Sequence, residues 1–186
     1  MDKPVGKVDK WYSDATKKRV LGIFAKQPLP GQVKTRLCPP LTPEQAADLY
    51  RVCLQETVTR MDAVTGCELV ICYSGDRDWF ATTFPGVKLV PQSGADLGER
   101  MARCLSDWLA TDYEAALLIG SDAPDLPLER IEQAFCALES ADLVHGPAVD
   151  GGYYLVGEAT HHPPLFQEIP WSTAVSYTHL TLPTKR

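Results

Sequence analysis

The stretch A-A-L-L-I-G-S-D, residues 115–122, decides the fold. Its first five residues form a continuous apolar run, which is typical of a strand buried on both faces in the middle of a parallel sheet. Gly120-Ser121-Asp122 then carries a carboxylate to the point where that strand ends. Because ligands of open α/β sheets bind beyond the carboxyl ends of the strands, this stretch predicts both an architecture and the place of a site.

Shorter apolar runs alternate with segments of helical periodicity on both sides of that stretch. Further strands are predicted at 20–25, 68–73, 87–90, 142–146 and 153–157, with a turn at 74–76. Helices are predicted to begin at Thr42, Asp96 and Pro127; the first two have Gln45 and Glu99 three residues later, as in a capping box, and Leu49 is expected on the buried face of the first. The pattern predicts an α/β protein of three α/β/α layers around a mainly parallel central sheet.

The composition is that of one globular domain. Of 186 residues, 45% are hydrophobic and 23% are charged. The net charge of −6 argues against general nucleic-acid binding, and no apolar run approaches the ~20 residues of a membrane-spanning helix. Six cysteines without a C-x-x-C pair favour free thiols and a reducing, cytoplasmic location.

Three zones are predicted along the chain. Residues 1–19 are polar and form a loose N-terminal extension, and residues 20–175 form the folded domain. Residues 176–186 (SYTHLTLPTKR) do not continue the pattern and are interpreted as a non-native tail, with a native C-terminal strand as the alternative.

Positive charge gathers in the loop after the first predicted strand. Lys26, Lys34 and Arg36 lie there, and Gly31 forms a turn that permits close approach of the backbone to a ligand. Cations at alternate positions suit a diphosphate, although Val33 stands where a Walker loop needs glycine. The alternative is a solvated basic loop.

Acidic residues follow other predicted strands. Asp122 is the candidate ligand of a hard divalent cation, which prefers oxygen ligands and bridges phosphates. A turn or helix-capping role is the alternative, and it explains Asp125 better. Helix capping likewise explains Asp96, although the free N–H groups of that helix start, around Gly98, could contact a nucleotide.

Asp150-Gly151-Gly152-Tyr153 follows the fifth strand. The Asp-Gly pair is a common hairpin turn, but two glycines also let the backbone lie flat against a ligand that Asp150 faces. The pattern therefore leaves a hairpin and a substrate-contacting segment open.

Five motifs together resemble one family: FAKQPLPGQVKTRL, GADLGERM, LLIGSDAPDL, GPAVDGGYYLVG and IPWST. In this order they resemble the bacterial GT-A-like glycosyltransferases of the arsenosugar-biosynthesis or selenodomain-associated type, in the nucleotide-diphospho-sugar transferase superfamily. The resemblance covers about residues 20–173. It implies a GT-A-like fold and metal-assisted transfer of a sugar from a nucleoside-diphosphate sugar to a small acceptor.

The resemblance also implies roles for single residues. Lys34 and Arg36, with Lys26 and Gly31, would hold the donor diphosphate, and Asp96 and Gly98 would lie near the nucleoside. Asp122 would bind Mg²⁺ or Mn²⁺, and Asp150 is the candidate base near the sugar or acceptor, where Gly151, Gly152 and Tyr153 would contact substrate.

Two alternatives to sugar transfer stay open. The same loop and metal could serve a nucleotidyltransferase that joins a nucleoside triphosphate to a phosphorylated acceptor and releases pyrophosphate, or a nucleotide-binding module without activity. Members of the resembled family continue past the W-S-T motif with a further helix and strand, so the resemblance also predicts a C-terminally truncated fragment of weakened or absent activity.

Overall fold

A six-stranded sheet with the strand order β3-β2-β1-β4-β6-β5 forms the centre of the molecule. The structure is a computed structural model that describes residues 18–148 and 152–166. Strand β6 runs antiparallel to β4 and to β5, whereas β1 is parallel to β2 and β4, and β2 to β3. The mainly parallel sheet is thus confirmed. The strands are β1 (Arg19–Lys26), β2 (Glu68–Ser74), β3 (Lys88–Pro91), β4 (Ala115–Gly120), β5 (Leu143–Pro147) and β6 (Tyr153–Glu158).

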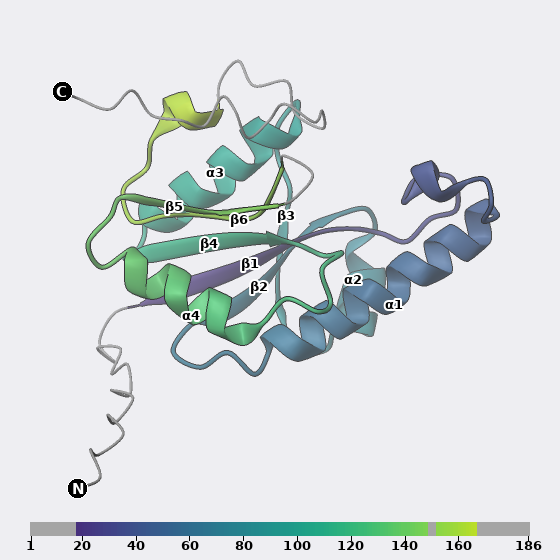
Figure 1. The fold of residues 1–186 in the computed structure, drawn as a ribbon, viewed down its shortest axis with the longest axis horizontal. Helices are drawn as coiled ribbons and strands as arrows, with labels where there is room; N and C mark the ends of the chain where they lie inside the picture. The colour runs from purple at the N-terminus through teal and green to yellow at the C-terminus, as the bar shows by residue number, and fades with distance from the viewer. Residues whose placement is uncertain (1–17, 149–151, 167–186) are drawn as a thin grey trace, which may run out of the picture.

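Helices cover both faces of the sheet, as Figure 1 shows. One face packs against α1, α2 and α4, and the other against α3 and the short 3-10 helix η2. This arrangement confirms the predicted three layers. The helices are η1 (Thr35–Leu37), α1 (Pro43–Met61), α2 (Arg77–Thr83), α3 (Leu97–Leu109), α4 (Leu128–Ala137) and η2 (Pro163–Phe166).

Helix α1 begins with the predicted capping box. The Thr42 hydroxyl accepts from the Gln45 N–H (3.3 Å), and the Gln45 side chain accepts from the Thr42 N–H (2.9 Å). The buried face was only partly predicted, because Leu49 is 44% exposed whereas Leu54 and Val58 lie in the core. The α1 sequence has apolar residues on more than one side, so spacing alone did not fix which side faces the sheet.

Helix α2 was missed, and residues 74–76 are more than the predicted turn. Asp76 is the N-cap of this helix: its side chain accepts from the Asp78 N–H at 3.0 Å. Phe80 and Phe84 bury the inner face. Seven residues give too few turns for a helical period to show in the sequence.

The carboxyl ends of β1 and β4 lie side by side, because the two strands are parallel neighbours in register from Arg19–Ala115 to Phe24–Gly120. In Figure 1 both strands run towards the right, where the loop before α1 projects from the molecule. Strand β1 begins at Arg19, one residue inside the predicted N-terminal extension. None of the helices in the described part of the chain is long and apolar enough to cross a membrane.

Candidate active site

The loop after β1 is shaped by a turn and a buried anchor. Gly31 has a φ of +74°, and the Gln32 N–H donates to the Leu29 carbonyl at 3.0 Å, so Pro30-Gly31 occupies the centre of a turn whose third position requires positive φ. Val33 is 6% exposed and fixes the loop to the core. Lys34, the next residue, is therefore held where the chain emerges from the core.

Lys34 and Asp122 form an ion pair across the two strand ends. The Lys34 Nζ lies 2.6 Å from the Asp122 Oδ2, and the two side chains are 30% and 52% exposed. Lys34 has a left-handed backbone (φ 49°), which is uncommon for a residue with a Cβ and is found at functional sites. The structure thus brings together two of the predicted site residues. Arg36 lies on the same loop, in η1, and is exposed.

A buried hydroxyl pair lies beneath this ion pair. The Tyr50 hydroxyl accepts from the Lys26 N–H at 3.1 Å and shares a hydrogen bond of 2.6 Å with the Ser121 hydroxyl. Burial raises the pKa of Tyr50, so its hydroxyl stays protonated at neutral pH. Sequence analysis did not single out Tyr50, because its position in the helical pattern is that of any residue on the buried face of α1.

Two glutamines that sequence analysis did not single out tie the strand ends together. The Gln92 side-chain amide donates to the Ala25 carbonyl at 3.2 Å and to the Cys72 carbonyl at 2.8 Å. The Gln27 side chain accepts from the Asp76 N–H at 3.0 Å. Nothing in the local sequence pattern signals such long-range contacts.

The start of α3 has the geometry that the sequence predicted for a cap. The Asp96 Oδ1 accepts from the Glu99 N–H (2.8 Å), and the Glu99 Oε2 accepts from the Ala95 N–H (2.8 Å). The bond from the Ala95 N–H, together with the ion pair to Arg103 (2.6 Å), lowers the pKa of Glu99. Gly98 is buried in the first turn. Capping therefore accounts for Asp96, and a nucleotide contact there stays a prediction.

The segment between β5 and β6 is described only at its two ends. The Ala148 N–H donates to the Gly152 carbonyl at 2.9 Å, as expected for the closing of an antiparallel pair. The Tyr153 hydroxyl donates to the Met101 sulfur at 3.5 Å, and burial raises the pKa of Tyr153. Asp150 and Gly151 lie outside the described residues, as do the I-P-W-S-T motif and the predicted tail.

The residues that are described fit a metal ion held together with substrate. Residues 18–148 and 152–166 contain no group of three or more His, Cys, Asp or Glu side chains that could hold an ion. Asp122 offers a half-exposed carboxylate whose present partner is already a cation. Mg²⁺ commonly takes one or two carboxylates and completes its shell with water and substrate phosphates, and this donor set suits that mode.

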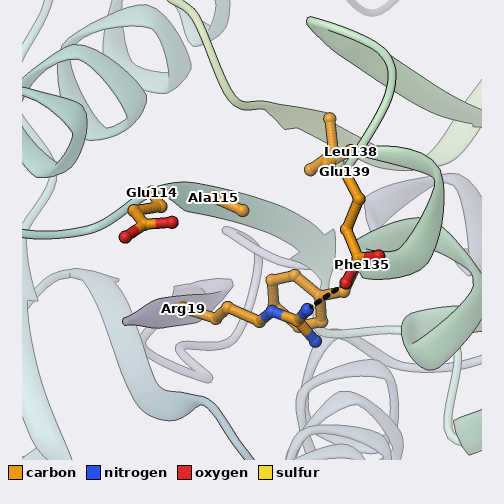
Figure 2. Close-up of a pocket in the computed structure, with 6 residues that line it drawn as sticks. All are labelled: Arg19, Glu114, Ala115, Phe135, Leu138 and Glu139. Carbon is orange, nitrogen blue, oxygen red and sulfur yellow. Dashed lines mark hydrogen bonds and ion pairs between the residues drawn. The ribbon is translucent and has the colours of Figure 1, made fainter. Parts of the chain in front are cut away.

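A small pocket lies at the opposite edge of the sheet, at the amino ends of β1 and β4. Figure 2 shows the Arg19 guanidinium in an ion pair with Glu139. The two charged groups are 2.7 Å apart, and the guanidinium lies 5.5 Å from the Phe135 ring centroid. These contacts satisfy the buried cation, and the pocket is separate from the Lys34–Asp122 edge. Its lining residues are Arg19, Glu114, Ala115, Phe135, Leu138 and Glu139.

Comparisons with known proteins agree with this architecture. Residues 57–173 match the bacterial family described as "Uncharacterized protein conserved in bacteria (DUF2064)". A crystal structure from Desulfovibrio desulfuricans G20, described as a candidate nucleotide-diphospho-sugar transferase, is 36% identical to the chain, with a TM-score of 0.80 over 87% of this chain and 73% of that one. No curated protein matches the sequence.

More distant structures share the fold alone. The 4-diphosphocytidyl-2C-methyl-D-erythritol synthase of Anaerococcus prevotii DSM 20548 is 12% identical, with a TM-score of 0.55 over 87% of this chain and 82% of that one. A cytidylyltransferase of Leptospira borgpetersenii serovar Hardjo-bovis is 12% identical, with a TM-score of 0.53 over 88% and 68%. At such identities the likeness concerns the arrangement of strands and helices and carries no activity with it.

Proposed function

The chain belongs to the bacterial DUF2064 family and has the fold of the nucleotide-diphospho-sugar transferases, and on that premise we propose that it is a transferase that moves a sugar from a nucleoside-diphosphate sugar to a small acceptor. The description of the Desulfovibrio desulfuricans structure, at 36% identity, supports a substrate of this class. The transfer of a sugar in particular rests on the resemblance of the five motifs and on the chemistry of the site.

The observation that carries the proposal is the Lys34–Asp122 ion pair of 2.6 Å. It places a cation and a carboxylate together beyond the carboxyl ends of two adjacent strands, where open α/β sheets bind their ligands. A diphosphate brought there would take Lys34 as a partner in place of Asp122. Asp122 would then be available to a divalent cation.

The main chemical problem of the reaction is the leaving diphosphate. The bond between the anomeric carbon and the diphosphate oxygen breaks, and its electron pair leaves with the diphosphate. Lys34, with Lys26 and Arg36 on the same loop, would stabilise that charge through hydrogen bonds and Coulomb attraction. A Mg²⁺ or Mn²⁺ ion bound by Asp122 would add further neutralisation of the leaving group.

The acceptor hydroxyl must lose a proton as its oxygen bonds to the anomeric carbon. Asp150 is the candidate base in an inverting reaction, since a carboxylate within hydrogen-bond reach can accept that proton. Gly151, Gly152 and Tyr153 would then face the sugar or acceptor. This part of the proposal rests on sequence position, because Asp150 and Gly151 lie outside the described residues.

Nucleotidyl transfer is the competing activity, since the same basic loop and metal could hold a nucleoside triphosphate. Two measurements test the proposal. A thermal-shift screen of nucleoside diphosphates, triphosphates and nucleotide sugars, each with and without Mn²⁺, identifies the ligand, because a molecule that binds only the folded state raises the melting temperature. Analysis of the products then identifies the reaction. Release of nucleoside diphosphate would support sugar transfer, whereas release of pyrophosphate would refute sugar transfer and support nucleotidyl transfer.

A further inference from the structure

The hydrogen-bond ladder between β1 and β4 ends just before the candidate site. The last register pair is Phe24–Gly120. The ladder of backbone hydrogen bonds therefore does not continue from Lys26 to Ser121. The Gln27 N–H donates to the Ser74 carbonyl of β2 at 2.8 Å. Since successive N–H groups of a strand point to opposite sides, the Lys26 N–H points towards β4.

The Tyr50 side chain takes the place of the backbone hydrogen bond that would continue the β1–β4 ladder at Lys26. Its hydroxyl accepts from the Lys26 N–H at 3.1 Å and bonds the Ser121 hydroxyl at 2.6 Å, so one oxygen bridges the two diverging segments. Tyr50 and Ser121 are only 6% and 4% exposed. Water therefore cannot readily replace the tyrosine, and loss of its hydroxyl would remove a hydrogen-bond partner from the buried Ser121 hydroxyl.

Helix α1 also holds the β4 loop at a second place, further along the helix. The Arg60 Nε donates to the Leu126 carbonyl at 3.1 Å. The Thr57 hydroxyl packs 3.5 Å from the Ser121 carbonyl but donates to the Cys53 carbonyl of its own helix at 2.8 Å. The loop that carries Asp122 is thus fixed along one side of a helix whose start is itself fixed by a capping box. Tyr50 is the member of this set that also contacts the β1 loop.

We propose that Tyr50 is a positioning residue, whose hydroxyl sets the separation between the loop that carries Lys34 and the loop that carries Asp122. This inference rests on the proposed function for its ligand, a nucleoside diphosphate. Asp122 directly follows Ser121, whereas residues 27–33 separate Lys34 from Lys26 on a loop that the buried Val33 anchors to the core. A site that must offer a cation and a carboxylate to one diphosphate needs that separation held before the ligand arrives.

The test compares Tyr50→Phe with Tyr113→Phe. The Tyr113 hydroxyl donates to Glu68 at the amino ends of β2 and β4, so this control removes a tyrosine hydrogen bond at the opposite edge of the sheet. The affinity for a nucleoside diphosphate is measured with and without Mn²⁺. We expect Y50F to reduce the enhancement by Mn²⁺ about tenfold, the effect of about one hydrogen bond, and Y113F to leave it unchanged. An enhancement in Y50F equal to that of the wild type, with only a lower melting temperature, would overturn the proposal.

A second measurement needs no nucleotide and separates this inference from the proposed function. The coupling between Lys34 and Asp122 is obtained from the unfolding of Lys34→Met, Asp122→Asn and the double variant, in the wild-type and Y50F backgrounds. Loss of the coupling in Y50F supports a positioning role even if the wild type binds no nucleoside diphosphate, a result that would refute the proposed function alone. A coupling of equal size in both backgrounds would refute the positioning role.

Discussion

The Nζ of Lys34 lies 2.6 Å from the Oδ2 of Asp122, so a cation from the loop after β1 already occupies the carboxylate that a metal ion would need. In the proposed site, the lysine and a metal ion would therefore be alternative partners of the Asp122 carboxylate. A phosphate that attracts Lys34 would release Asp122, and binding of nucleotide and of metal should then strengthen each other by the same factor.

Asp122→Asn should abolish the enhancement of nucleotide binding by Mn²⁺. The amide keeps the shape of the side chain but has neither the charge nor the second ligating oxygen that a hard cation prefers. We expect the affinity for nucleoside diphosphate in the presence of Mn²⁺ to fall about 10- to 100-fold, as measured by titration calorimetry. Asp125→Asn is the matched control on the same loop, since Asp125 is exposed and further from the strand end. Equal Mn²⁺ dependence in D122N and the wild type would contradict the metal assignment.

Lys34→Met should have opposite effects on two affinities. Nucleotide binding should weaken about 10- to 100-fold, because a charged hydrogen bond to phosphate contributes about 1.5–3 kcal/mol. Binding of Mn²⁺ alone should become tighter, because the competing ammonium is gone. The free energy of unfolding should change by less than about 1 kcal/mol, since solvent screens this partly exposed pair.

Lys88→Met is the control for Lys34→Met, because Lys88 pairs with Glu68 at 3.2 Å at the amino ends of β2 and β3. It should leave both affinities unchanged. Weaker Mn²⁺ binding in K34M than in the wild type would show that the lysine and the metal do not compete.

The start of α3 should weaken in acid. The pKa of Glu99 lies below its ordinary value of 4.5 because the carboxylate accepts from the Ala95 N–H and pairs with Arg103. A lowered folded pKa means that this stabilisation is present above pH 4.5 and is lost as the pH falls through the folded pKa. The melting temperature of Glu99→Gln should therefore approach that of the wild type as the pH falls from 4.5 through the folded pKa. Glu129→Gln, in the first turn of α4, is the control, and a constant difference between E99Q and the wild type from pH 3 to 7 would be the contrary result.

Gly22→Ala should destabilise the packing of α3 on the sheet. A methyl group on Gly22 would lie 2.5 Å from the Trp108 ring and 2.6 Å from the Leu118 side chain, closer than such atoms can approach. Overpacking of this kind costs about 1–3 kcal/mol, which denaturant unfolding can measure. Val52→Ala, at a side chain that is 60% exposed, should change stability by less than about 0.5 kcal/mol. Equal stability of G22A and the wild type would mean that the helix can move away from the sheet freely.

Sequence patterns within a few residues correctly predicted the central strand and two helix starts. The apolar run 115–119 predicted a buried strand, and residues 115–120 form β4 at the centre of the sheet. The caps at Thr42 and Asp96 form as their sequence spacing indicates, because each involves residues within one helical turn. The place of Asp122 follows from the same logic, since a parallel strand delivers its next residues to a known edge.

The remaining features depend on contacts between distant parts of the chain. Tyr50 and Ser121 are 71 residues apart, and no periodicity relates them. The place of β6 between β4 and β5 likewise depends on its antiparallel pairing with the distant β4, which the Asp-Gly turn signal beside β6 does not encode. Leu49 was placed inside because α1 has apolar residues on two sides, and only the packed sheet selects between them.

Lys34 combines two demands that oppose each other. Its left-handed backbone, with φ at 49°, is one that glycine adopts readily, whereas its ammonium group is what the proposed site uses. Lys34→Gly would relieve the backbone and remove the charge at once. Directed evolution that selects only for thermal stability would therefore favour the replacement of Lys34. Selection for turnover would retain the lysine despite its conformational penalty.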